Sequence, residues 1–122
     1  MSFFVTFESK QEAFKGLLQT HFNRPLRLRG EWEVGIAMLY MPLTASPIWA
    51  FSNIVEFTYV NEVPMQLLGV LDSNDHKIKK PLYFKVCKKT ISNINMDFKQ
   101  DPKSDNFTLE TPIVCILHFR KA

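Results

Sequence analysis

Apolar residues recur at every second position over most of this chain, which is the period of a β-strand. The clearest run covers residues 30–42, GEWEVGIAMLYMP, where a glycine opens the run and a proline closes it. One face of this run is large and the other begins polar and becomes small. We expect a central strand whose large face packs against a second layer. Its predicted core residues are Trp32, Val34, Ile36, Met38 and Tyr40.

Shorter alternating runs occur on both sides of this strand, and clusters of turn-forming residues separate them. The last run, residues 113–120, adds Ile116 and Phe119 to the predicted core. The strongest loop signals are residues 72–76 and 100–106, where nearly every residue favours turns. About eight short strands with turns between them are typical of an all-β antiparallel sandwich or barrel. No linker divides the chain, so we expect one β-sandwich domain over residues 1–122.

One segment has a helical pattern instead. Ser9 and Glu12 match a capping box, and apolar residues follow at helical spacing. This pattern predicts a short helix near residues 10–21. Gly16 weakens that prediction, and tertiary contacts can make the segment extended instead.

Composition adds little that points to a particular partner. The 122 residues carry a net charge of +3, and eleven phenylalanines suit pleated surfaces. Residues 1–8 lack the basic start and long apolar region of a signal peptide, and no apolar run approaches the ~20 residues of a membrane span. We therefore expect an intracellular protein without a membrane partner.

Candidate chemistry is sparse. His21, His76 and His118 are scattered, and none has a second ligand at a metal-binding spacing. Glu31 and Glu33 flank Trp32, an arrangement that suits carbohydrate chemistry, but solvated acids beside a core aromatic are the favoured interpretation. The sequence predicts no enzyme, no catalytic residue, no cofactor, no metal and no small-molecule substrate.

Two further features leave alternatives open. Cys87 and Cys115 are favoured as free thiols, although a sandwich could bring them together as a disulfide. A set of cations forms either a solvated face or a surface for nucleic acid or another acidic partner. This basic partner surface comprises Arg24, Arg27, Arg29, Lys77, Lys79, Lys80, Lys85, Lys88 and Lys89.

Two segments resemble a known family. Residues 26–36, LRLRGEWEVGI, continuing to YMP at residues 40–42, are similar to the "L-x-L-x-G-E-W-E-V" strand of minor capsid (penton) proteins. Residues 114–121, VCILHFRK, are similar to the strand that closes the same proteins, which belong to Polinton/Maverick elements and adintoviruses. The resemblance implies a single jelly roll without enzymatic activity. It also implies pentamers at capsid vertices, other capsid proteins as partners, and a place in the virion.

Two hypotheses of function follow. The first is a structural assembly protein, a single jelly roll that acts by self-association as a capsid component. The alternative is a small β-barrel or sandwich that binds nucleic acid through its basic surface.

Overall fold

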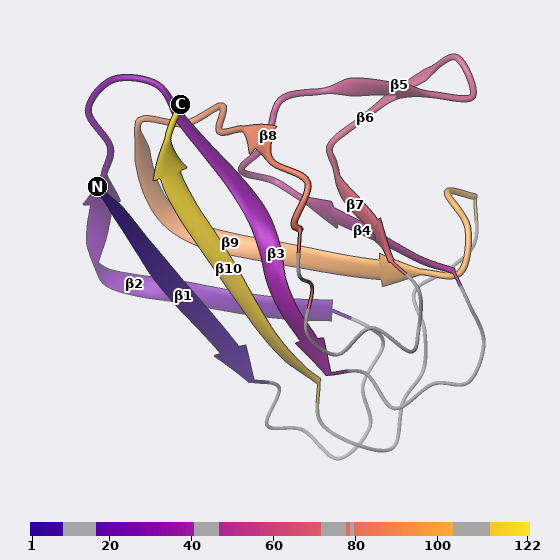
Figure 1. The fold of residues 1–122 in the computed structure, drawn as a ribbon, viewed down its shortest axis with the longest axis horizontal. Helices are drawn as coiled ribbons and strands as arrows, with labels where there is room; N and C mark the ends of the chain where they lie inside the picture. The colour runs from indigo at the N-terminus through magenta and orange to yellow at the C-terminus, as the bar shows by residue number, and fades with distance from the viewer. Residues whose placement is uncertain (9–16, 41–46, 72–77, 79, 104–112) are drawn as a thin grey trace.

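The computed structural model describes residues 1–8, 17–40, 47–71, 78, 80–103 and 113–122. All regular secondary structure in these residues is antiparallel β-structure (Figure 1). The strands are β1 (Ser2–Glu8), β2 (Leu17–Arg27), β3 (Trp32–Tyr40), β4 (Ile48–Ser52), β5 (Thr58–Val60), β6 (Val63–Met65), β7 (Leu67–Leu71), β8 (Phe84–Lys85), β9 (Thr90–Lys99) and β10 (Val114–Lys121).

Eight of these strands form two packed sheets, in the orders β1-β10-β3-β8 and β2-β9-β4-β7. The pairs β1/β10, β2/β9, β3/β8 and β4/β7 are nested, as if one long hairpin had been rolled up. Figure 1 shows β1, β10 and β3 side by side in one layer and β9 and β4 in the other. This nesting is the arrangement of a jelly roll, so the protein is a jelly-roll-like antiparallel β-sandwich.

The remaining two strands, β5 and β6, form a separate hairpin in the connection between β4 and β7. Asn61 and Glu62 form its two-residue turn, and both have positive φ angles, of 47° and 68°. Positive φ at both central positions is typical of the type I′ turn that matches the twist of a hairpin. The hairpin lies between β4 and β7 in the chain, and the pairing of these two strands has a register shift between Ala50 and Phe51.

The core lies between the inner faces of the two sheets. The alternation of the strands puts Val34, Leu117 and Phe119 on the inner face of one sheet, where they are fully buried. Met96 and Phe98 of β9 are equally buried and belong to the other sheet. Of the core residues expected from the sequence, Trp32, Val34, Ile36 and Phe119 lie in this core.

The other three expected core residues, Met38, Tyr40 and Ile116, lie outside this core, and for the two in β3 the reason is a bulge. Ile116 pairs with Met38 and Leu117 pairs with Ile36, so Ala37 is an extra residue in β3. Beyond this bulge the facing of β3 is inverted, since one added residue exchanges the two faces of a strand. Leu39 turns into the core, whereas Met38 turns outward.

Tyr40 and Ile116 share the outward position of Met38. Tyr40 is 45% exposed, and Ile116 lies between the fully buried Cys115 and Leu117 in β10. Because neighbouring residues of a strand face opposite sides, Ile116 must lie on the outer face of the sheet. The prediction that Met38, Tyr40 and Ile116 are core residues was therefore wrong.

The short helix expected near residues 10–21 is wrong for residues 17–21, which form a strand. Residues 17–21 of the predicted segment belong to β2, where Leu18 pairs with Met96 and Thr20 with Ile94. Pairing with β9 satisfies the backbone groups of this segment and buries Leu18, and these tertiary contacts outweigh the local helical spacing. Residues 10–16 lie outside the described residues. In the described part of the chain, no helix is long and apolar enough to cross a membrane.

Candidate functional site

Three segments that are distant in the sequence meet at one end of the sandwich. The amide of Leu28 donates a hydrogen bond of 2.7 Å to the carbonyl of Lys89, and the amide of Val86 donates one of 2.9 Å to the carbonyl of Trp32. Lys121 lies opposite Trp32 in the register of β10 and β3. The connections before β3 and before β9 are thereby joined to the end of β10.

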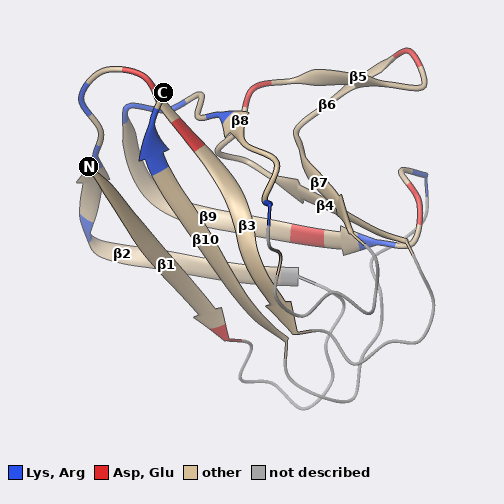
Figure 2. Ribbon diagram, in the orientation of Figure 1, with Lys and Arg blue, Asp and Glu red and all other residues tan. Residues whose placement is uncertain are grey.

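Cations gather at this end (Figure 2). We call it the basic end, and its members are Arg24, Arg27, Arg29, Lys85, Lys88, Lys89, Arg120 and Lys121. All are exposed except Lys88, which is half-buried.

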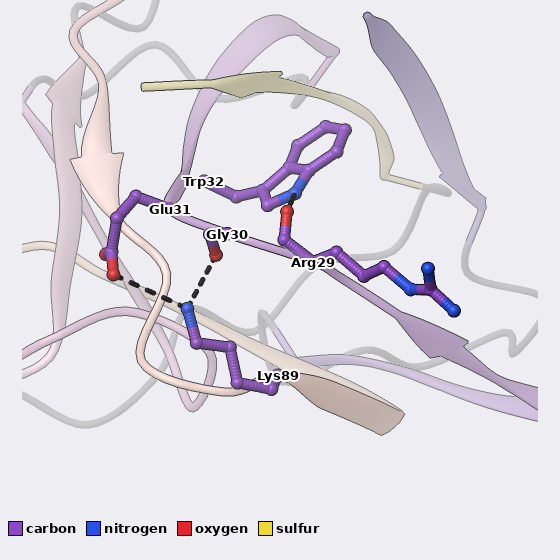
Figure 3. Close-up of polar contacts among 5 residues, drawn as sticks. All are labelled: Arg29, Gly30, Glu31, Trp32 and Lys89. Carbon is purple, nitrogen blue, oxygen red and sulfur yellow. Dashed lines mark hydrogen bonds and ion pairs between the residues drawn. The ribbon is translucent and has the colours of Figure 1, made fainter.

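The turn that carries Arg29 is held in place by a hydrogen bond from a core residue, Trp32. The indole Nε1 of Trp32 donates a hydrogen bond of 2.9 Å to the carbonyl of Arg29. Gly30 follows with a φ of +81°, a conformation that side-chain-bearing residues rarely adopt. Lys89 Nζ donates to the Gly30 carbonyl and lies 3.5 Å from a carboxylate oxygen of Glu31. Figure 3 shows the guanidinium of Arg29 extending away from these contacts.

Two cations of the basic end are paired with acids. Lys89 lies beside Glu31, and Arg120 Nε donates to Glu33 Oε1 at 2.5 Å. Within the residues that the structure describes, the other six members form no ion pair with a carboxylate. Among the described residues, the basic end therefore carries more positive charge than its carboxylate partners neutralise.

The cations of the basic surface expected from the sequence do not all lie together in the structure. The fold brings the three arginines together with Lys85, Lys88 and Lys89, whereas Lys80 lies beside Leu71 and Leu82 around a separate apolar cavity of about 210 Å³. Lys77 and Lys79 lie outside the described residues. The sequence interpretation missed Arg120 and Lys121, although antiparallel pairing of the last strand with residues 32–40 would have placed both beside Trp32 and Glu33.

A second candidate surface is the outer face of the sheet β1-β10-β3. The register places Phe4 beside His118, Ile116 beside Met38 and Val114 beside Tyr40. Phe4 is 64% exposed, which is unusual for a phenylalanine. We call Phe4, Met38, Tyr40, Val114 and Ile116 the outer apolar face; the bulge in β3 contributes two of its five members.

His118 is held at the border between the two surfaces. The ring of Phe4 stacks on its imidazole at 4.6 Å between centroids, and Tyr83 Oη lies 2.7 Å from Nδ1. The guanidinium of Arg120 lies 3.5 Å above the ring of Tyr83. His118 is therefore a packed residue in an aromatic cluster, and no group of three potential metal ligands was found in the described residues.

Tyr83 reaches His118 because Gly35 leaves space for its chain segment. A Cβ atom at Gly35 would lie 2.6 Å from the carbonyl oxygen of Leu82 and 3.3 Å from the ring of Tyr83. Residues 81–83 therefore cross directly over the backbone of β3. A side chain at this position would push the segment outward and separate Tyr83 from His118.

The acids beside Trp32 do not form a sugar-binding arrangement. Trp32 is only 5% exposed and belongs to the core, so its ring offers no stacking surface. Glu31 and Glu33 each contact a cation of the basic end.

A second cavity, of about 280 Å³, lies elsewhere, between β4, β9 and the chain around Gln66. Three amides line it: Asn53 and Gln66 donate to backbone carbonyls, and Asn95 Oδ1 accepts a hydrogen bond from Asn93.

The two cysteines are free and differ in exposure. Cys87 is exposed, whereas Cys115 is fully buried in the core. Burial raises the pKa of the Cys115 thiol from 9.0 to about 12, so this thiol stays protonated at neutral pH.

We predict that iodoacetamide modifies one thiol in the native protein and two in the denatured protein. The thiolate is the reactive form, and only Cys87 is accessible in the fold. Mass spectrometry after labelling at mildly alkaline pH counts the adducts, and Cys87→Ser should remove the native adduct. Rapid labelling of both thiols in the native state would contradict the burial of Cys115.

The basic end spans both sheets, and its part on β3 and β10 borders the outer apolar face at His118. Comparison with protein-family models, with curated proteins and with solved structures found no match for this chain.

Proposed function

We propose that this protein is a structural assembly module, a single jelly roll that acts by self-association as a minor capsid or penton-like component. In this role it forms a closed homo-oligomer, a pentamer at a capsid vertex, and meets other capsid proteins in the virion. It has no catalytic task. Shape and surface complementarity alone would then determine its activity.

One observation carries this proposal: the two segments that resemble penton proteins are neighbours in the fold. Their described parts contain β3 and β10, which pair from Trp32 opposite Lys121 to Tyr40 opposite Val114. These strands lie at the centre of their sheet. A resemblance restricted to two distant stretches is more informative when the stretches form one structural unit, in a jelly roll as the resemblance requires.

The outer apolar face supports the proposal independently. It lies on the same two strands and on β1, and it carries exposed Phe4 and Tyr40 and half-buried Met38, Val114 and Ile116 where a strand of a monomeric sandwich usually carries polar side chains. Contiguous exposed apolar side chains mark protein–protein contacts more often than isolated ones do. A second subunit packed here would bury Phe4 and Ile116.

The test is the solution mass, measured by light scattering over a concentration series at low and high salt. We expect a closed oligomer that persists at high salt, because burial of apolar surface is not screened by ions. The double variant Phe4→Glu/Ile116→Thr should be a folded monomer, since it places a charge and a hydroxyl in the proposed contact.

The matched control is Tyr59→Glu, which puts the same charge on an aromatic residue that is 81% exposed on the β5–β6 hairpin. This variant should keep the wild-type mass. A wild-type monomer at every concentration would contradict self-association. If both variants reduced the solution mass of the oligomer equally, the outer apolar face would not be the contact between subunits.

A further inference from the structure

We propose that the basic end binds the phosphate backbone of double-stranded nucleic acid without reading its sequence. This proposal rests on the placement of charge and does not depend on the self-association proposed above. The partner is identified by its chemistry, a dense array of phosphates on a rigid duplex.

Cations from distant parts of the sequence converge at the basic end. Positive charges from β2, from the segment before β9 and from the end of β10 meet because backbone hydrogen bonds and strand register bring these segments together. In the sequence they are separated by up to about a hundred residues. The fold thus concentrates eight cations, with two paired acids among them, at one end of the molecule.

Hydrogen bonds and an ion pair hold the backbone under these cations in place. Trp32 anchors the carbonyl of Arg29, and Lys89 bridges Gly30 and Glu31, so the backbone under the arginines is braced by its neighbours. The described part of the chain offers no carboxylate partner to Arg24, Arg27 or Arg29. Arginines on a braced backbone, with free guanidinium groups, suit bidentate contacts with phosphate.

The surroundings of these cations suit nucleic acid better than an acidic protein. A protein interface usually has an apolar or aromatic centre inside a polar rim. Within the described residues 24–31 and 85–90, no large hydrophobic side chain is exposed. Binding driven by release of counterions from phosphates needs no such centre. No exposed aromatic side chain lies in these two stretches to stack unpaired bases, and the exposed ring of Phe4, on the neighbouring outer apolar face, is stacked on His118; the duplex is therefore the favoured form.

The experiment measures binding of the full chain to a fluorescent DNA duplex of mixed sequence and about 20 base pairs, between about 50 and 200 mM salt. If the six unpaired cations each contact a phosphate, the affinity should fall about 10³-fold over this range. The variant Arg27→Ser/Arg29→Ser removes two contacts and should fall only about 10²-fold, with weaker binding at low salt.

The control variant is Lys99→Ser/Lys103→Ser. β9 leads from the basic end at Thr90 to Lys99, and Lys103 lies beyond it, so both lysines are far from the basic end. Each double variant lowers the net charge from +3 to +1, since 3 − 2 = 1. Circular dichroism would establish that both variants are folded. Only the arginine variant should lose affinity and salt dependence.

Three results would overturn the proposal. Absence of duplex binding by the wild type at low salt would exclude the site. Equal losses in both double variants would show that binding follows net charge and not placement. A polyglutamate competitor that binds the basic end more tightly than the duplex, at equal charge concentration, would identify an acidic polypeptide as the partner.

Discussion

Replacing Trp32 with alanine is expected to lower the free energy of unfolding by about 3–5 kcal/mol, as for other large buried aromatic residues. The indole is almost fully buried and contacts the ring of Phe3 at 5.4 Å between centroids. Its removal leaves a cavity between the sheets and also frees the carbonyl of Arg29, which loses its hydrogen bond. For a domain of this size such a loss is a large part of the total stability.

Chemical denaturation followed by circular dichroism measures this effect. Trp32→Phe keeps most of the packing and removes the hydrogen bond, so it should cost less than the alanine variant. Tyr59→Ala removes an exposed aromatic side chain and should change stability by less than about 0.5 kcal/mol. A folded Trp32→Ala variant with wild-type stability would show that the indole is not in the core, and would reopen the hypothesis of a ligand-binding aromatic.

Replacing Gly35 with alanine is expected to destabilise the protein by about 1–3 kcal/mol, although only one methyl group is added. The new Cβ would lie 2.6 Å from the carbonyl oxygen of Leu82, a backbone atom that cannot rotate away. The segment 81–83 must therefore move, and Tyr83 must leave the imidazole of His118. The variant should disturb the aromatic cluster and the stability together.

Gly69→Ala is the matched control. Its Cβ would lie 3.9 Å from the Cδ1 of Ile36, an ordinary van der Waals contact, so this variant should be near neutral or slightly stabilising. Denaturant titration compares the two variants, and the ¹⁵N chemical shifts of the His118 imidazole report whether Tyr83 still bonds to Nδ1. Equal stability of both variants, with unchanged shifts at His118, would refute the close crossing over Gly35.

The fold class followed from the sequence because alternation is a local property that each strand carries by itself. Trp32, Val34 and Ile36 were placed correctly in the core for this reason. The bulge at Ala37 could not be predicted, since it depends on how β3 aligns with β10. Without it, a strict period of two assigns Met38 and Tyr40 to the wrong face.

The error at residues 17–21 has a different cause. Leu18 is spaced as on an amphipathic helix, but it is equally suited to the inner face of a strand, and only the partner strand β9 decides between them. The basic end was predictable in part. Its arginines and Lys85, Lys88 and Lys89 were identified as candidates. Their meeting with Arg120 and Lys121 required the pairing of strands that are distant in the chain.

The nesting of the strands also determines when the protein can fold during its synthesis. Ser2 pairs with Arg120, so the first described strand receives its partner only after residue 120 has left the ribosome. Until then β1 and β3 lack the strand that separates them in the finished sheet, and their apolar faces are open to solvent. Such long-range pairing is intrinsically slow and leaves the nascent chain prone to aggregation. Loss of β10 would therefore remove the centre of one sheet and prevent its assembly altogether.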